Sequence, residues 1–203
     1  MPISNMIIKR LLKSIRDLDH YSEEDVDVAR YGFEAVFWEI EKNLYFFFIF
    51  LLLGHSIEWL FSLAVIASIR FFAGGVHVKS VWGCFFLTLL SFIAPILVFP
   101  VIVPTNNISI VLVSLFSVLI LILAAPVIPE NRKKLVDTSK SPRKKLIAIL
   151  VTLIWFGFIF SYQHHLLASI AMWTIFLQNV QLFTALLRNN KSRFMRRSQN
   201  LSS

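Results

Sequence analysis

The chain has 203 residues, of which 57% are hydrophobic and 16% charged, and its formal net charge is +8. A mean hydropathy of +0.70 excludes an ordinary soluble domain and is typical of an integral membrane protein. Its single cysteine cannot form an intramolecular disulfide, so the fold does not depend on an oxidising compartment. Because the basic residues flank apolar segments and form no soluble patch, we expect no nucleic-acid partner.

The first 43 residues are polar and mixed in charge, and they predict amphipathic helices without a signal peptide. In residues 3–18, apolar side chains recur about every four positions, which indicates a helix that lies on the membrane surface or packs on the rest of the protein. The run from Ser22 to Asp25 has a capping-box pattern and predicts the start of the next helix. On the polar face of that helix we expect Glu34 in solvent, with the alternative that it orients His77 or a substrate group.

Residues 44–69 form a 26-residue apolar stretch with a polar centre at residues 54–58. The stretch is either one tilted helix with a buried polar pair or a hairpin of two short helices that turns near Gly54. We favour the hairpin, because an ionisable group in the middle of a bilayer is costly. His55 and Glu58 have the i, i+3 spacing of metal ligands, but no second pair completes a site, so we expect neither a metal nor a cofactor.

Four later segments each have the length and apolarity of a transmembrane helix. They are residues 81–103, 108–128, 146–162 and 166–187. The last of them carries four polar side chains, Gln178, Asn179, Gln181 and Thr184. Since unpaired polar groups are unfavourable in lipid, we expect these side chains to face other helices or to line a peptide groove.

Positive charges gather in residues 70–79, in residues 130–145 and after residue 187, whereas the turns between the other predicted spans are uncharged. The positive-inside rule therefore places the three basic segments in the cytoplasm. With a hairpin near Gly54, the chain crosses the membrane six times from a cytoplasmic N-terminus. With a single crossing there, the N-terminal region lies outside.

The predicted fold is an all-α multipass membrane bundle of about six transmembrane segments, preceded by amphipathic helices. We treat the chain as one membrane domain, residues 1–203. It has an N-terminal region at 1–43, a transmembrane region at 44–187 and a basic cytoplasmic tail at 188–203.

The stretch from Arg70 to Cys84 separates two apolar regions and concentrates chemistry-bearing residues. It contains the only cysteine, one of the five histidines and three of the six glycines. His77 and Cys84 are seven residues apart, so on one continuous helix they would lie about 10 Å apart, too far for a hydrogen bond. A dyad therefore requires a non-helical chain around His77. We expect Ser80 to be the N-cap of the next helix, with Cys84 at about its fourth residue. The alternative is a packing cysteine and an inert histidine.

The same stretch resembles a known signature. Arg70, the run Ala73–His77 and Cys84 look like the signature of the accessory gene regulator protein B family, membrane peptidases that process quorum-sensing peptide precursors in Gram-positive bacteria. Residues 31–34, Tyr-Gly-Phe-Glu, look like the family's N-terminal motif, and residues 125–127, followed by a basic loop, look like its central one. The loop at residues 129–135 departs from the family, which more often has a proline near its end.

The resemblance implies a cysteine endopeptidase in which Cys84 is the nucleophile and His77 the base. A thioester at Cys84 would release the acidic C-terminal tail of the precursor, and a substrate cysteine or serine would then close a thiolactone or lactone ring. Arg70, Gly74 and Gly75 are candidate supporting residues of such a site, with the alternative that Arg70 anchors at the lipid headgroup layer. A rival interpretation from another class is a non-enzymatic membrane peptide exporter or assembly factor.

The expected partners are the precursor peptide and membrane lipids, and a homodimer is allowed. Lys133 and Lys134 in the basic loop are candidates to meet the acidic substrate segment, with anionic lipid headgroups as the alternative. Either partner would meet these lysines on the cytoplasmic side of the bacterial cell membrane.

Overall fold

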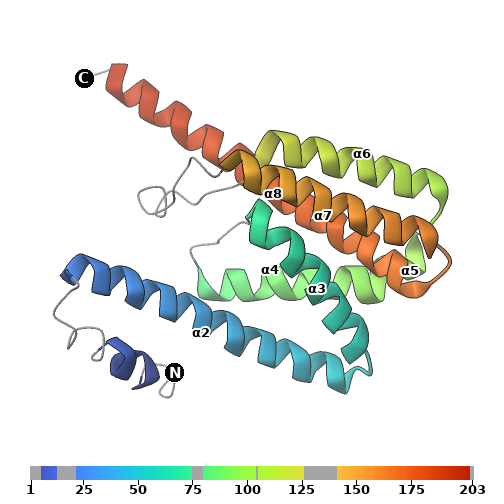
Figure 1. Ribbon diagram of the computed structural model, residues 1–203, viewed down its shortest axis with the longest axis horizontal. Helices are drawn as coiled ribbons and strands as arrows, with labels where there is room; N and C mark the ends of the chain where they lie inside the picture. Colours follow the sequence, from blue (N-terminus) through green and yellow to red (C-terminus); the bar gives the residue numbers. More distant parts are fainter. Residues whose placement is uncertain (1–5, 13–21, 75–79, 104, 126–140, 202–203) are drawn as a thin grey trace. The chain divides into compact units, whose positions relative to one another are not determined.

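In a computed structural model, the described residues are 6–12, 22–74, 80–103, 105–125 and 141–201, and they fold as helices without a strand. The chain divides into two compact units, residues 1–54 and 55–203. Figure 1 shows the helices of both units in sequence colours. The predicted all-α class is confirmed, and the expectation of one membrane domain stays a prediction.

The first unit contains a helical segment at residues 6–12 and the helix α2, Glu23–Leu52. Ser22 caps α2: its hydroxyl accepts the Asp25 amide at 3.2 Å, and its own amide donates to the Asp25 carboxylate at 3.0 Å. The Ser22 hydroxyl also donates to the Asp25 carboxylate at 2.6 Å, and this bond, together with the one from the Ser22 amide, lowers the pKa of Asp25 below its ordinary value of 3.8. The predicted capping box is thus confirmed.

The helix α2 is longer than the sequence pattern suggests, because it runs without a break through the polar-to-apolar boundary at residues 43–44. Two local contacts lie at this boundary. The Lys42 ammonium lies 2.6 Å from the Glu39 carboxylate, and the Asn43 amide donates to the Glu39 carbonyl at 2.8 Å. Pairing within the helix satisfies these polar groups, so the change in composition does not end the helix.

The apolar stretch at residues 44–69 is broken where its polar centre begins. The helix α2 ends at Leu52, Gly54 has a φ of +75°, and α3 begins at Ser56. A residue in the left-handed backbone conformation cannot continue a right-handed helix, and glycine adopts the left-handed conformation most easily. The alternative of one continuous helix is therefore wrong. The predicted turn near Gly54 is confirmed, although the helix before it is long and not short.

The second unit holds all the remaining helices. They are α3 (Ser56–Ala73), α4 (Val81–Ile93), a π-helical turn (Ala94–Val98), α5 (Phe99–Ile102), α6 (Asn107–Ala124), α7 (Ser141–Ser161) and α8 (Leu166–Leu201). The helix α8 packs against each of the others and forms the centre of the unit. Half of the residues in its apolar part are buried, against 22–33% in the other four apolar helices.

Aromatic and hydroxyl contacts fix the directions of the helices around α8. The Gln181 side chain donates a hydrogen bond to Ser91 on α4. The ring centroids of Trp173 and of Phe99, which is on α5, are 4.7 Å apart. The later residue of the α4–α5 stretch thus contacts the earlier residue of α8, so this stretch and α8 run antiparallel. The π-helical turn lies between these contacts, at Pro95, whose ring removes an amide donor and disfavours regular helical bonding there.

Five helical stretches are long and apolar enough to cross a membrane. They are Ser56–Ala73, Trp82–Ile102, Asn107–Ala124, Pro142–Ser161 and Leu166–Arg188. The shortest has 18 residues and a length of about 27 Å, close to the hydrocarbon thickness of a bilayer. The helix α2 is not among the five, so the count over the described residues is one lower than the predicted six.

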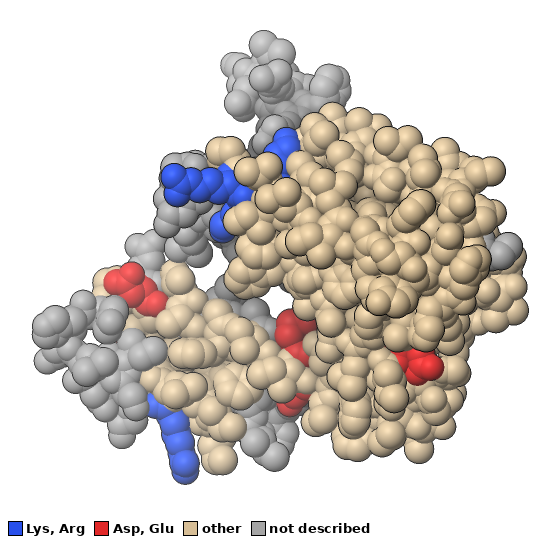
Figure 2. All heavy atoms as spheres, turned by 45° about the vertical axis from the view of Figure 1, so that its right-hand side comes forward, with Lys and Arg blue, Asp and Glu red and all other residues tan. Residues whose placement is uncertain are grey.

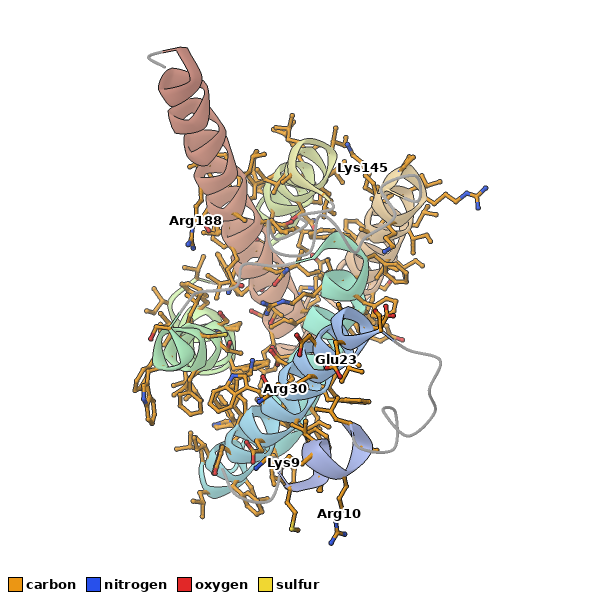
Figure 3. The ribbon with its side chains drawn as sticks, turned by 90° about the vertical axis from the view of Figure 1, so that its left-hand side faces the viewer. Lys9, Arg10, Glu23, Arg30, Lys145 and Arg188 are labelled. Carbon is orange, nitrogen blue, oxygen red and sulfur yellow. The ribbon has the colours of Figure 1, made fainter. Side chains whose placement is uncertain are left out.

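The outer faces of these spans are apolar, and two of the spans, in α3 and α8, have an arginine at their C-terminal end. Ile108, Leu112 and Leu115 on α6 are each more than 60% exposed, as expected of side chains that meet lipid. Figure 2 shows how few charged side chains interrupt the uncharged surface. Arg70 lies in the last turn of α3, and Arg188 ends the apolar part of α8 and extends away from that helix (Figure 3). The protein is therefore a multipass membrane protein.

Candidate active site

Cys84 lies in the first turn of α4, as the fourth residue of the helix. Ser80 is the N-cap, with extended backbone angles, and its hydroxyl accepts the Gly83 amide at 3.3 Å. The Cys84 amide donates to the Ser80 carbonyl at 2.9 Å, and the Thr88 hydroxyl donates to the Cys84 carbonyl at 2.8 Å. The predicted N-cap is confirmed, and the partly exposed Cys84 lies at the N-terminus of α4.

The end of α3 carries two of the supporting residues that the sequence predicts, Arg70 and Gly74. Arg70 lies in the last turn, and its carbonyl accepts the Gly74 amide at 2.9 Å. Gly74 has a φ of +80° and caps the helix, so a glycine is required there for conformational reasons. The backbone conformation at the end of α3 therefore explains why position 74 is a glycine. The role of Arg70 toward a substrate stays a prediction.

His77 and Gly75 lie outside the described residues, between the end of α3 and the start of α4, and so do Lys133 and Lys134 in the basic loop. The bounds of the flanking helices nevertheless bear on the dyad. Because α4 begins at Val81, His77 and Cys84 do not share one continuous helix. The separation of about 10 Å, which holds for two residues seven apart on one helix, is therefore not an objection to the dyad.

Three side-chain amides within four residues of α8 bond to neighbouring parts of the unit. The side-chain amide of Gln178 donates to the Gly74 carbonyl at 3.2 Å, that of Asn179 to the Ser117 hydroxyl at 2.8 Å, and that of Gln181 to the Ser91 hydroxyl at 2.6 Å. The expectation that these side chains face other helices is confirmed. Thr184 differs, since it is exposed and donates to the Gln181 carbonyl of its own helix at 2.7 Å.

The contact between Gln178 and Gly74 is the one feature of the site that the sequence pattern does not predict. An amide in an apolar helix indicates a polar partner, but it does not identify the partner as a backbone carbonyl 104 residues away. The bond links the central helix to the last residue before the segment that contains His77.

Glu34 belongs to the first unit and lies on the exposed side of α2. Its carboxylate accepts a hydrogen bond from the Arg30 guanidinium at 3.0 Å, and both side chains are about half exposed. This is the solvated ion pair expected of a polar helix face. A role of Glu34 in orienting His77 stays a prediction.

His55 and Glu58 lie at the start of α3. The closest atoms, His55 Nδ1 and Glu58 Oε1, are 3.7 Å apart, which is longer than a hydrogen bond. Within the described ranges there is no group of three His, Cys, Asp or Glu side chains that could hold a metal ion.

Exposed aromatic side chains flank Cys84. Trp82 and Phe86 stack with ring centroids 6.3 Å apart and are 70% and 60% exposed. Aromatic rings of this kind are typical of the boundary between lipid headgroups and hydrocarbon. The first turn of α4 therefore has the character of an interfacial segment.

Comparisons with known proteins agree with this architecture. The sequence profile described as accessory gene regulator B matches residues 4–184. A curated AgrB-like protein of Clostridium beijerinckii is 29% identical over 185 residues, which cover 86% of this chain and 89% of that protein. No solved structure matches the chain. The chain therefore belongs to the accessory gene regulator B family, which processes peptides and acts in the accessory gene regulator quorum-sensing system.

Proposed function

We propose that this protein is a membrane cysteine endopeptidase that removes the C-terminal tail of a quorum-sensing propeptide, with Cys84 as nucleophile and His77 as base. The observation that carries the proposal is the position of Cys84, partly exposed in the capped first turn of α4. A packing cysteine has no need of a helix N-terminus, whereas a nucleophilic thiolate is stabilised by one.

In the first step, His77 accepts the proton of the Cys84 thiol, and the sulfur attacks the carbonyl carbon of one peptide bond. The tetrahedral intermediate places negative charge on oxygen. The backbone amides near Gly83 and the side chain of Arg70 are candidate donors to that oxygen. As the carbon–nitrogen bond breaks, the protonated His77 gives its proton to the leaving amine, the tail departs, and a thioester to Cys84 remains.

In the second step, a cysteine or serine side chain of the bound peptide gives its proton to His77 and attacks the thioester carbonyl. A thiolactone or lactone ring closes, and Cys84 leaves as a thiolate, which His77 protonates. The sequence involves no net oxidation or reduction. A membrane site with little water would favour the internal nucleophile over hydrolysis, because water is the competing nucleophile.

The expected place of the reaction is the cytoplasmic face of the cell membrane, where a newly made precursor is available. The basic loop with Lys133 and Lys134 would attract the acidic tail of the precursor, and the same cations would also meet anionic lipid headgroups. The Gly74–Gly75 pair would let a peptide backbone approach closely.

The direct test replaces Cys84 by alanine and follows cleavage of a co-expressed precursor. Cys84→Ala should abolish release of the tail while the protein still inserts into the membrane. The matched control is Ser114→Ala on α6, which also changes one small side chain, a hydroxyl that donates to the Val111 carbonyl of its own helix at 2.8 Å, and should cleave at about the normal rate. Full cleavage by Cys84→Ala would leave the exporter or assembly factor as the better interpretation.

A further inference from the structure

Two contacts set the register between α8 and the stretch that runs from α4 to α5. Ser91, near the end of α4, accepts a hydrogen bond from the Gln181 amide. Further along, the ring of Phe99 lies against that of Trp173. From the first contact to the second, the chain goes eight residues forward on the α4–α5 stretch and eight residues back on α8. One residue forward on one stretch therefore corresponds to one residue back on the other.

The same register, continued toward the start of α4, brings Cys84 level with Arg188. Cys84 precedes Ser91 by seven residues, and Arg188 follows Gln181 by seven. Seven residues make nearly two helical turns, so each pair lies on one side of its helix. Cys84 is therefore on the side of α4 that faces α8, and Arg188 is on the side of α8 that faces α4. In Figure 3, the Arg188 side chain extends from α8 on the side where the light green α4 is drawn.

These facing sides form a polar seam between the two helices. Ser91 is 7% exposed, so the seam is closed at this level. Thr184 and Arg188 are exposed and Cys84 is partly exposed, so the seam is open at the start of α4. The seam consists of Cys84, Thr88 and Ser91 on α4 and of Gln181, Thr184 and Arg188 on α8.

The side of α4 that meets lipid is a different one. Trp82, Phe86 and Leu90 recur every four residues and are each at least 60% exposed. Two positions on a helix are about 200° apart, so Trp82 and Phe86, each two residues from Cys84, lie on the opposite side of α4. The thiol therefore faces the seam and not the lipid.

Arg188 carries a cation for which the second unit offers no partner among its described residues. None of the described side chains forms an ion pair or a hydrogen bond with it. Glu58 is the one acidic residue that the structure describes in this unit, and it lies one turn before Ser62, whose hydroxyl is 2.9 Å from that of Thr174. Thr174 is about 21 Å from Arg188 along α8, so Glu58 lies near the other end of the span.

We propose that Arg188 is a substrate-binding residue, whose guanidinium binds a carboxylate of the precursor while the scissile carbonyl lies at Cys84. This inference rests on the proposed function and adds a specificity-determining contact to it. A guanidinium binds a carboxylate through two parallel hydrogen bonds. An extended peptide advances about 3.3 Å per residue, so an acidic side chain a few residues from the scissile bond spans the seam. Arg188 lies beyond residues 4–184, which the family profile matches, so family membership assigns it no such role.

The test measures cleavage of the precursor by the purified full-length protein in lipid nanodiscs, where both membrane faces are accessible. Arg188→Gln should raise KM about tenfold or more and leave kcat within about twofold, because it removes a charge-assisted hydrogen bond to the bound peptide. The matched control is Arg143→Gln. Arg143 is also exposed and lies at the start of the apolar span Pro142–Ser161, and its replacement should change KM by less than about twofold.

Charge reversal identifies the carboxylate that Arg188 binds. Arg188→Glu should cleave the natural precursor poorly, and a precursor with lysine in place of one acidic residue should restore cleavage. Each Asp and Glu of the precursor is replaced in turn, and Arg143→Glu is the control protein. Restoration at no position, or equal restoration at every position, would overturn the inference, because a direct pair depends on one position and long-range attraction does not.

If Arg188→Glu fails to accumulate, Arg188→Gln is combined with precursors in which each acidic residue is replaced in turn by glutamine. At the contacted position, the neutral precursor should raise KM for the wild-type protein and cause no further increase for Arg188→Gln. Independent increases at every position would overturn the inference.

A lipid anchor and an effect on the thiol predict other results. Equal effects of Arg188→Gln and Arg143→Gln, or an effect of Arg188→Gln only in nanodiscs that contain anionic phosphatidylglycerol, would indicate headgroup binding and overturn the inference. A small maleimide alkylates the single cysteine, and without precursor its rate should be equal within about twofold in wild type and Arg188→Gln. Alkylation slowed about tenfold by Arg188→Gln would show that Arg188 acts on the thiol and not on the peptide.

The two proposals fail in different ways. Full cleavage by Cys84→Ala would refute the proposed function, and the role of Arg188 would fall with it. An inactive Cys84→Ala variant beside an Arg188→Gln variant with normal KM would leave the proposed function intact and refute only the role of Arg188.

Discussion

At the scale of single residues, the local environment of Cys84 depends on the cap that Ser80 provides. Ser80 accepts the Gly83 amide, and its carbonyl accepts the Cys84 amide. A cap of this kind contributes about 0.5–2 kcal/mol to helix stability, and its removal frays the first turn. The position of the thiol at the helix N-terminus is therefore a consequence of one side chain four residues earlier.

Ser80→Ala should slow both alkylation of Cys84 and precursor cleavage by about tenfold, because fraying removes the thiol from the ordered helix N-terminus. Ser80→Thr should keep both rates near normal, since threonine also caps helices. The comparison is made by maleimide labelling at about pH 6.5 and by a cleavage assay on the same membranes. Equal rates for the alanine and threonine variants would show that the cap does not support the nucleophile.

At the scale of helices, the polar side chains of α8 differ in what they contribute. Asn179 is fully buried, and its amide nitrogen bonds to Ser117 and to the Ile175 carbonyl. Its oxygen Oδ1 is buried without a hydrogen-bond partner among the described atoms. The gain from one bond between helices is thus opposed by an unsatisfied acceptor, and such bonds in membrane proteins average only about 0.6 kcal/mol.

Asn179→Leu should therefore change the free energy of unfolding by less than about 1 kcal/mol, because it removes a hydrogen bond and an unsatisfied oxygen together. Ser117→Ala removes only the partner and leaves the whole amide buried, so it should destabilise the protein more. Unfolding of the purified protein in mixed micelles would measure both. A loss of several kcal/mol for Asn179→Leu would indicate that the amide is fully satisfied and structurally essential.

The helices also show which features a sequence pattern can predict. Apolar length located the later spans, and the Ser22 and Ser80 caps were readable because capping depends on residues three positions apart. The sequence pattern does not predict that polar and apolar parts join into one α2, because a change of composition usually indicates a boundary between elements. The ion pair between Lys42 and Glu39 within the helix lets α2 continue through this change of composition. The Gln178–Gly74 bond was not predictable, because its partner is distant in sequence and carries no side chain.

At the scale of the whole molecule, the arrangement of spans determines on which side of the membrane Cys84 acts. The uncharged turn near Asn106 and the basic loop near Lys140 are separated by α6, which has 18 residues and a length of about 27 Å. Such a helix crosses the hydrocarbon layer once. The two loops should then face opposite sides, with the basic one in the cytoplasm.

Cysteines introduced at Asn106 and at Lys140, each in a Cys84→Ala background, should therefore be labelled from opposite sides by a reagent that does not cross membranes. Cys84→Ala without a new cysteine provides the background signal. Labelling of both positions from the same side would show that α6 does not cross the membrane, and the proposed cytoplasmic site would lose its main support.

The most direct test of the account is the rate at which the Cys84 thioester forms when His77 is replaced by glutamine. Glutamine resembles histidine in size and polarity but cannot accept the thiol proton, so the amount of precursor trapped on Cys84 after a fixed time reports the base alone. His77→Gln should form thioester at least a hundredfold more slowly, while His55→Gln should form it at about the normal rate. A His77→Gln protein that accumulates thioester at a near-normal rate would show that the helix N-terminus activates Cys84 unaided, and that result would contradict the dyad.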